Sequence, residues 1–173
     1  MMAMAADLRH LFIEGMSRAA TFVAVLTTEG PTGRFGVTVS SLTSVSADGE
    51  QPSLLACLHH LSPAAEAVLK NRVFCVNLLH EGQQEVANLF AGRTAPGEHG
   101  SRFDRTGWHA GPSGQPILLG ATASFECGLG TAVLWETHFV IVGKVSAVAL
   151  SDDPAALLYG QRDYRRAVHI PKG

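Results

Sequence analysis

The pattern of apolar and polar positions is most informative between residues 35 and 63. Apolar residues alternate with small or polar ones over 35–40, which predicts a strand. A hydroxyl-rich run over 40–46 predicts a loop, and the apolar run 54–58 predicts the second strand of a hairpin. Hydroxyls and backbone N–H groups in such loops could cradle an anion, but an ordinary hairpin with serines on its solvent face fits the same pattern.

Helical spacing of apolar residues predicts short helices around this hairpin. An amphipathic helix is expected over residues 5–20, ending near Ala20. Residues 63–71 follow Ser62 as a cap and place a proline at the first helical position. Residues 82–92 form a further helix that a terminal glycine stops. A short helix is also expected after residues 152–154, Asp-Asp-Pro.

The remaining apolar runs predict strands. Residues 21–28 are β-branched and apolar, and residues 73–79 are so continuously apolar that both faces should be covered. Three more strands are expected over 117–127, 133–142 and 144–150. Together these elements predict a mainly β fold, a closed antiparallel barrel with short helices, because closure removes exposed strand edges.

Between residues 93 and 116 the apolar content falls, and Gly, Pro, His and Arg accumulate. A long surface loop of this kind usually carries a function or a lid. Phe103 and Trp108 are the residues expected to anchor it to the body of the protein.

Composition narrows the class of protein. A chain of 173 residues with 46% hydrophobic and 16% charged residues indicates one well-packed domain, residues 1–173, or an obligate oligomer. A net charge of −2 gives no electrostatic reason to expect nucleic acid or an anionic membrane. Neither a transmembrane run nor a secretory signal is visible. Cys57, Cys75 and Cys127 lie in apolar runs without a CxxC pair, which favours free thiols in a reducing cytoplasm.

Single motifs indicate little chemistry by themselves. His59 and His60 are adjacent on an expected strand and would point to opposite faces, so no metal site is predicted. The sequence contains no nucleophile elbow, GxGxxG or P-loop. His138 is a lone imidazole in an apolar strand, which is more often structural than catalytic.

Taken in order, however, the segments resemble one family. The matching segments are FIEGMSRAATFVAVLTTEG, GVTVSSLTSVS, PSLLACLHHLSP, FCVNLL, QQEVANLFAG, GQPILLGATASFEC, THFVIVGKV and LLYGQRDYR. They resemble the short-chain flavin reductases, which have the FMN-binding split-barrel fold. These proteins are the reductase components of two-component monooxygenases with a diffusible flavin, such as the 4-hydroxyphenylacetate system.

The resemblance implies a Greek-key antiparallel barrel that transfers hydride from NADH or NADPH to FMN or FAD. It also implies a homodimer and a flavin-dependent oxygenase component as partner, reached by diffusion of the reduced flavin. Two alternatives stay open: a split barrel that binds flavin or haem without catalysis, and an oxidase of the pyridoxamine phosphate type.

The same resemblance implies roles for individual residues. Its flavin contacts are Thr38, Val39, Ser40, Ser41, Ser46, Cys57, Leu58, His59 and Ser62. Its contacts at the phosphate or adenylate end are Asn88, Ala91, Arg93, Arg102 and Phe103. His138 would contact the nicotinamide as the catalytic residue, and Tyr164 with Arg165 would hold the polar parts of the pyridine nucleotide.

Overall fold

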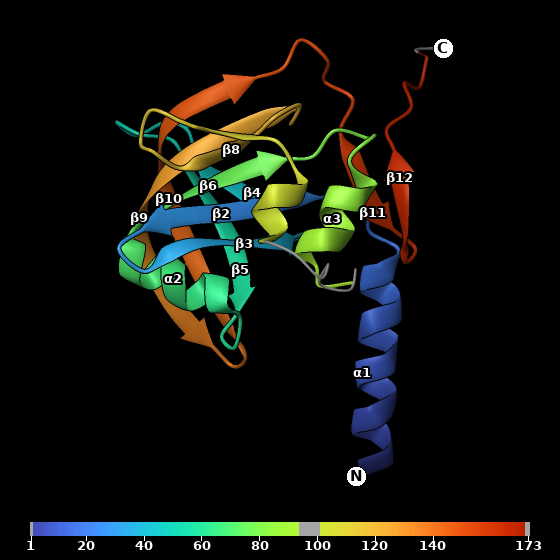
Figure 1. Cartoon of the computed structure of the whole chain (residues 1–173). Helices are drawn as coiled ribbons and strands as arrows, with labels where there is room; N and C mark the ends of the chain where they lie inside the picture. The colour runs from blue at the N-terminus through green and yellow to red at the C-terminus, as the bar shows by residue number, and fades with distance from the viewer. Residues whose placement is uncertain (1, 94–100, 172–173) are drawn as a thin grey trace.

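The computed structural model describes residues 2–93 and 101–171 (Figure 1). The helices are α1 (Met2–Ser17), α2 (Pro63–Asn71), α3 (Gln84–Phe90) and the 3-10 helix η1 (Arg102–Arg105). The strands are β1 (Thr21–Phe22), β2 (Ala24–Gly30), β3 (Gly33–Val39), β4 (Leu42–Ser46), β5 (Ser53–His59), β6 (Val73–Leu78), β7 (Trp108–Ala110), β8 (Pro116–Leu118), β9 (Ala123–Trp135), β10 (His138–Leu150), β11 (Leu157–Gly160) and β12 (Asp163–Arg166).

A seven-stranded antiparallel sheet forms the body, in the order β3-β2-β6-β9-β10-β5-β4. The sheet curls until β3 approaches β5, although these two strands are not hydrogen-bonded neighbours. Strands make up 48% of the structure and helices 20%, which confirms the prediction of a mainly β barrel with short helices.

The inner core fills the curled sheet. Leu26, Phe74, Leu58 and Ile141 point into it from four strands, and Val68 of α2 enters it from one side. Both Phe74 and Val68 are fully buried. The helix α2 therefore covers the interior of the barrel, as its sequence pattern predicts.

A second, outer core lies on the other face of the same sheet. Val25 alternates with Leu26 along β2 and packs there against Leu79, Phe90 and Leu157. Because other segments cover this face, β2 and β6 are buried on both sides, with Thr27 and Asn77 as buried polar residues on the outer one. The prediction that residues 73–79 are covered on both faces is confirmed.

The hydroxyl-rich run predicted as a loop is instead the edge strand β4, which pairs with β5 from Leu42 to Ser46. The expected hairpin between residues 35–40 and 54–58 is also wrong. The first of these strands, β3, pairs with β2, and β5 lies between β4 and β10. Serine and threonine are acceptable on a solvent-facing edge strand, where only one side of each residue is paired.

Two further predictions are wrong in the second half of the chain. The strands expected over 117–150 are mainly two long strands, β9 and β10, with register shifts at Val142/Gly143 and Val145/Ala147 in place of breaks. The helix expected after residues 152–154 is the hairpin β11–β12. Its turn residues Gln161 and Arg162 have φ values of 52° and 63°, in the left-handed region.

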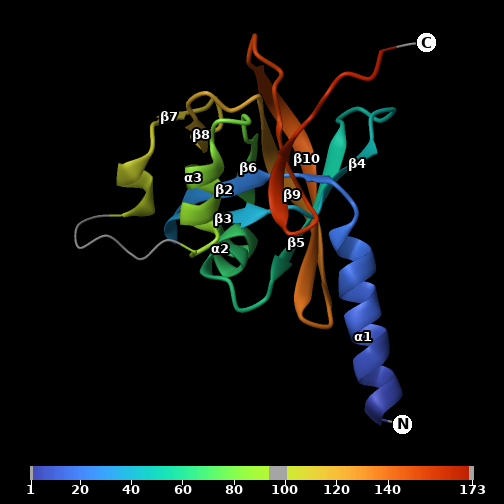
Figure 2. The same ribbon diagram turned by 90° about the vertical axis from the view of Figure 1, so that its right-hand side faces the viewer.

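The helix α1 projects away from the sheet, with its N-terminal end remote from the body (Figures 1 and 2). It is attached near its C-terminal end, where Arg162 bonds Glu14 at 2.9 Å and the Gln161 N–H donates to the Ser17 carbonyl. The apolar stripe on it is exposed: Leu8, Leu11, Phe12 and Met16 are 69%, 58%, 65% and 56% accessible. Within residues 2–93 and 101–171, no helix is both long and apolar enough to cross a membrane.

Part of the expected loop 93–116 lies outside the described residues, over 94–100. The described part contains η1 and β7, and Phe103 is buried and packs against Trp108, so the predicted anchors are confirmed. The next strand, β8, is held on the sheet by Asn77 of β6, whose side chain donates to the Pro116 carbonyl and accepts from the Leu118 N–H.

Candidate functional site

A pocket of about 150 Å³ lies between β3, the end of α3 and the hairpin β11–β12. We call it the tyrosine pocket; its lining residues are Val23, Thr38, Ser40, Ala91, Arg93, Tyr159 and Tyr164. Five of them, all except Val23 and Tyr159, are residues to which the resemblance gives a cofactor contact. The structure therefore gathers residues from four separate segments of the sequence.

Two tyrosines form one wall of the tyrosine pocket. Tyr159 and Tyr164 are opposite each other on β11 and β12, and their rings meet edge to face with centroids 5.4 Å apart. The Tyr164 hydroxyl donates to Asn88 Oδ1 at 2.8 Å, which brings a sixth predicted residue to the pocket edge. Burial raises the pKa of Tyr164, so this phenol stays protonated and remains a donor at neutral pH.

Arg93 is the cation of the tyrosine pocket. Its guanidinium lies over the Tyr159 ring, 5.5 Å from the centroid. The neighbouring Tyr159 phenol raises the pKa of Arg93 further, so its charge is permanent. Arg93 follows α3, which the Thr38 hydroxyl fixes to β3 by donating to the Ala87 carbonyl at 2.7 Å.

This donor set fits the phosphate end of a flavin nucleotide. The Arg93 guanidinium, the Ser40 hydroxyl and the Tyr159 phenol can donate to phosphate oxygens, and the aromatic faces can cover an apolar ring. The hydroxyl protons of Thr38 and Tyr164 are already donated to the Ala87 carbonyl and to Asn88 Oδ1. A flavin nucleotide is larger than this pocket, so the rest of the ligand would have to extend over neighbouring surface.

Three other predicted residues lie together around a separate pocket of about 290 Å³, between β3, α2 and η1. Ser62 and Arg102 line this pocket, as does the Phe103 ring. Phe103 meets Phe90 edge to face at 5.2 Å. The two pockets flank the end of α3, because Phe90 lines this one and the next residue, Ala91, lines the tyrosine pocket.

A third group lies where β5 ends and β10 begins, and we call His59, His60 and His138 the histidine corner. His59 is directly opposite His138 across the two strands, and their ring centroids are 5.0 Å apart. His60 lies 5.0 Å from His59. Both strand ends are exposed, which leaves these imidazoles accessible to a ligand.

Two of the predicted flavin contacts, Ser41 and Ser46, use their hydroxyls in hydrogen bonds to the main chain. Ser41 bridges both backbone groups of Cys57, accepting from its N–H at 3.0 Å and donating to its carbonyl at 3.1 Å. Ser46 ends the edge strand β4 and accepts a bond from the Asp48 N–H at 3.4 Å. The side chains of Val39 and Leu58 point into the inner core, so only their main-chain atoms could reach a ligand.

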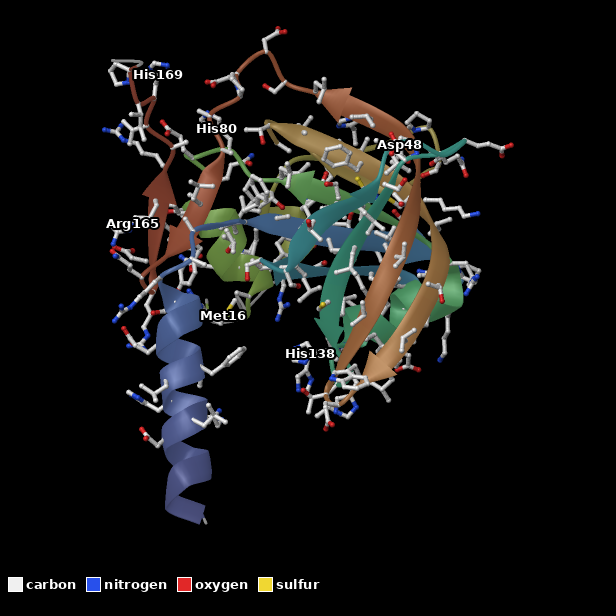
Figure 3. All side chains as sticks on the ribbon, turned by 180° about the vertical axis from the view of Figure 1, so that it is seen from behind. Met16, Asp48, His80, His138, Arg165 and His169 are labelled. Carbon is white, nitrogen blue, oxygen red and sulfur yellow. The ribbon has the colours of Figure 1, made fainter. Side chains whose placement is uncertain are left out.

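Within a single chain, the predicted site residues do not all lie in one place. Figure 3 shows His138 at the lower end of the barrel and Arg165 on the C-terminal hairpin, well apart. Arg165 is held by the Gln161 side chain at 3.0 Å and lines a third pocket, on which Tyr164 also borders.

Sequence reasoning missed Tyr159 and Val23 as lining residues. Tyr159 was part of the matching segment LLYGQRDYR, but the expected helix hid its partnership with Tyr164. A hairpin turn at residues 160–163 places the two tyrosines side by side, but neither Gln161 nor Arg162 signals such a turn in the sequence.

The curled antiparallel sheet and the helix that covers its interior define a split-barrel protein, and a pocket lined by hydroxyls and an arginine lies on its outer face. The flavin reductase like domain matches residues 16–167. The chain belongs to this family, which confirms the resemblance in its sequence.

Relatives with similar sequences carry specific names. The FMN reductase (NADH) RutF of Ancylobacter novellus is 39% identical over 165 residues, which cover 95% of this chain and 88% of that protein. The protein of the same name from Methylorubrum extorquens strain DM4 is 42% identical over 159 residues, covering 92% and 75%.

Solved structures of flavin reductases are also similar to this chain. BorF, the flavin reductase component of a bacterial two-component tryptophan halogenase, has a TM-score of 0.79 and 34% identity, covering 94% of this chain and 97% of that one. The NADH:FAD oxidoreductase SgcE6 of Streptomyces globisporus, in complex with NAD and FAD fragments, has a TM-score of 0.81 and 26% identity, covering 95% and 93%.

Proposed function

We propose that this chain is an NADH-dependent flavin reductase that supplies reduced FMN or FAD to a separate oxygenase. The observation that carries the proposal is the tyrosine pocket, in which Arg93, the Ser40 hydroxyl and the Tyr159 phenol come together. The names of the relatives, FMN reductase (NADH) and flavin reductase component, support the same activity.

In this proposal the tyrosine pocket holds the phosphate end of the flavin. Arg93 provides the permanent positive charge, and Tyr164, with Asn88 fixing its hydroxyl, closes one side. Arg102, near the other side of α3, holds the remaining polar parts of a dinucleotide, and the Phe103 ring beside it is buried in the outer core. Free backbone N–H groups near Ser41 would donate to the carbonyls of the flavin ring and stabilise negative charge there.

The bound nicotinamide and flavin rings themselves supply the hydride chemistry. The task of this chain is to stack the rings and to keep water out. His138 orients the carboxamide of the pyridine nucleotide and donates no obligatory proton. Its exposed position at the start of β10 suits a contact with a ligand that enters and leaves in each cycle.

The active unit in this proposal is a homodimer of a single-domain chain. The exposed apolar stripe of α1 needs a partner, and the exposed Val133, Leu134 and Trp135 of the β9–β10 hairpin offer a second apolar surface. A second copy would also bring the histidine corner of one chain toward the pockets of the other. The free thiols fit a cytoplasmic location.

The test is NADH oxidation followed by absorbance with FMN, with FAD and without flavin. The proposal predicts turnover that depends on added flavin and produces free reduced flavin, which a purified flavin-dependent oxygenase can consume. A bound chromophore without NADH oxidation would instead indicate a carrier. Oxidation of an organic amine in place of NADH would indicate an oxidase of the pyridoxamine phosphate type.

A further inference from the structure

In the histidine corner the rings of His59 and His138 pack against each other, and contact with a ligand does not explain this packing. His59 ends β5 and His138 begins β10, and the register places them directly opposite each other. Their rings meet at 80°, so one presents its edge to the face of the other. Such edge-to-face contacts fix the relative orientation of two rings.

Each imidazole also uses one ring nitrogen in a local hydrogen bond. His59 Nδ1 accepts from the Leu61 N–H at 3.2 Å. Because a backbone N–H can only donate, the proton of neutral His59 is on Nε2. His138 Nδ1 lies 2.9 Å from the Thr137 hydroxyl, which leaves Nε2 of His138 as the nitrogen free for a ligand.

The main chain holds both strand ends together. The His60 N–H donates to the Thr137 carbonyl at 2.9 Å, and the Ser62 N–H donates to the His59 carbonyl at 2.9 Å. The turn before His138 contains Glu136 in the left-handed region, with φ of 51°. Both rings are exposed, but both stand on strand ends that these bonds hold together, so their edge-to-face contact is maintained.

We infer that His59 is a positioning residue for His138. Its ring, held by the Leu61 N–H, fixes the plane of the His138 ring so that the free Nε2 keeps one direction toward the carboxamide of the pyridine nucleotide. This inference rests on the proposed role of His138. It differs from the flavin contact that the family resemblance implies for His59, because His59 acts here through another side chain.

A double-mutant cycle tests this inference, with His59→Ala, His138→Ala and the pair. His59→Ala should raise the KM for NADH about five- to tenfold, with kcat and the KM for flavin within about twofold, because only one orientation is lost. In the His138→Ala background the same change should have no further effect. His59→Phe keeps the edge-to-face ring but loses the acceptor for the Leu61 N–H, so it should restore only part of the loss.

His109→Ala is the control, since His109 is an exposed imidazole on β7 and lies outside the histidine corner. It should leave the KM for NADH unchanged. An equal effect of His59→Ala in both backgrounds, or a rise in the KM for flavin, would overturn the inference.

A spectroscopic readout separates this inference from the proposed function. NMR side-chain coupling constants report the rotamer of His138. They should indicate one rotamer in the wild type and in His109→Ala, and an average over several in His59→Ala. Unchanged coupling constants of His138 in His59→Ala refute the positioning role, whatever the activity. A wild-type protein that does not reduce flavin with NADH refutes the proposed function even where the coupling constants of His138 change.

Discussion

Arg93 reaches the tyrosine pocket from the residues that follow α3, and the chain at this position is fixed by a bond from its N–H to the Asn88 carbonyl at 3.0 Å. Arg93→Ala should raise the KM for FMN about tenfold or more, because a charge-assisted phosphate contact contributes roughly 1.5–3 kcal/mol. At saturating flavin kcat should change little. Steady-state kinetics at varied FMN measure both constants.

Lys70→Ala removes the same charge from the exposed surface of α2 and is the control for Arg93. An unchanged KM for FMN in Arg93→Ala would move the phosphate away from the tyrosine pocket.

Cys127 gives stability a pH dependence with a defined sign. Burial, with the nearby Glu126 carboxylate, raises its pKa to about 12. In the unfolded chain the thiol ionises near about 8.5, so the folded state holds the proton more tightly. The resulting stability is fully present below about pH 8.5 and is lost as the pH rises toward about 12. The wild type should lose about 2 kcal/mol more than Cys127→Ala between about pH 8 and about pH 10.

Urea unfolding at these two pH values measures this difference, since all other titrating groups are common to both proteins. Equal losses of unfolding free energy in the wild type and in Cys127→Ala would mean that folding does not raise the pKa of the Cys127 thiol.

At the scale of elements, β3 lies close to Phe90 of α3 and Phe103 of η1 because residue 36 has no side chain. A Cβ on Gly36 would lie 2.7 Å from Phe90 Cε1 and 3.2 Å from Phe103 Cζ. Gly36→Ala should therefore cost about 1–3 kcal/mol and displace η1 together with Arg102. Urea unfolding should show the lower stability, and the KM for flavin should rise.

Gly128→Ala is the matched control, because a Cβ on Gly128 meets nothing within 4 Å. It should be neutral or slightly stabilising. Equal stability of the two variants would show that the aromatic rings can move without cost.

The sequence predicts elements well where one period dominates. The α2 helix has a proline at its start and an apolar side, and both were readable from residues 62–71. Glycines 128, 130 and 143 made β9 and β10 look like shorter strands, because a glycine in a strand reads as a break or a bulge. The turn at Gln161–Arg162 was unreadable, since neither residue is one that favours positive φ.

For the site, local sequence gave only candidates. Thr38, Ser40, Ala91, Arg93 and Tyr164 meet in the tyrosine pocket through pairings between distant segments, which no periodicity encodes. The ordered series of motifs led to them through the family resemblance. Tyr159 was missed because its placement depends on a hairpin that the local signals did not indicate.

At the scale of the whole molecule, the apolar stripe of α1 makes a specific case for a dimer. Leu8, Leu11, Phe12 and Met16 share one side of the helix and contact water in the single chain. Burying each such side chain contributes roughly 1.5–3 kcal/mol, so a second copy covering this stripe would be held firmly. The wild type should therefore have twice the mass of one chain by light scattering at micromolar concentration.

Leu11→Glu places a charge in the stripe and should shift the protein toward monomers, with loss of NADH oxidation because the pockets and the histidine corner no longer meet. His10→Glu adds the same charge on the opposite side of α1 and should leave the dimer intact. A wild type that is monomeric, or a Leu11→Glu variant that is monomeric and fully active, would show that one chain contains the whole site. The loss of mass and activity together, in Leu11→Glu alone, is the result that requires a site shared between two copies.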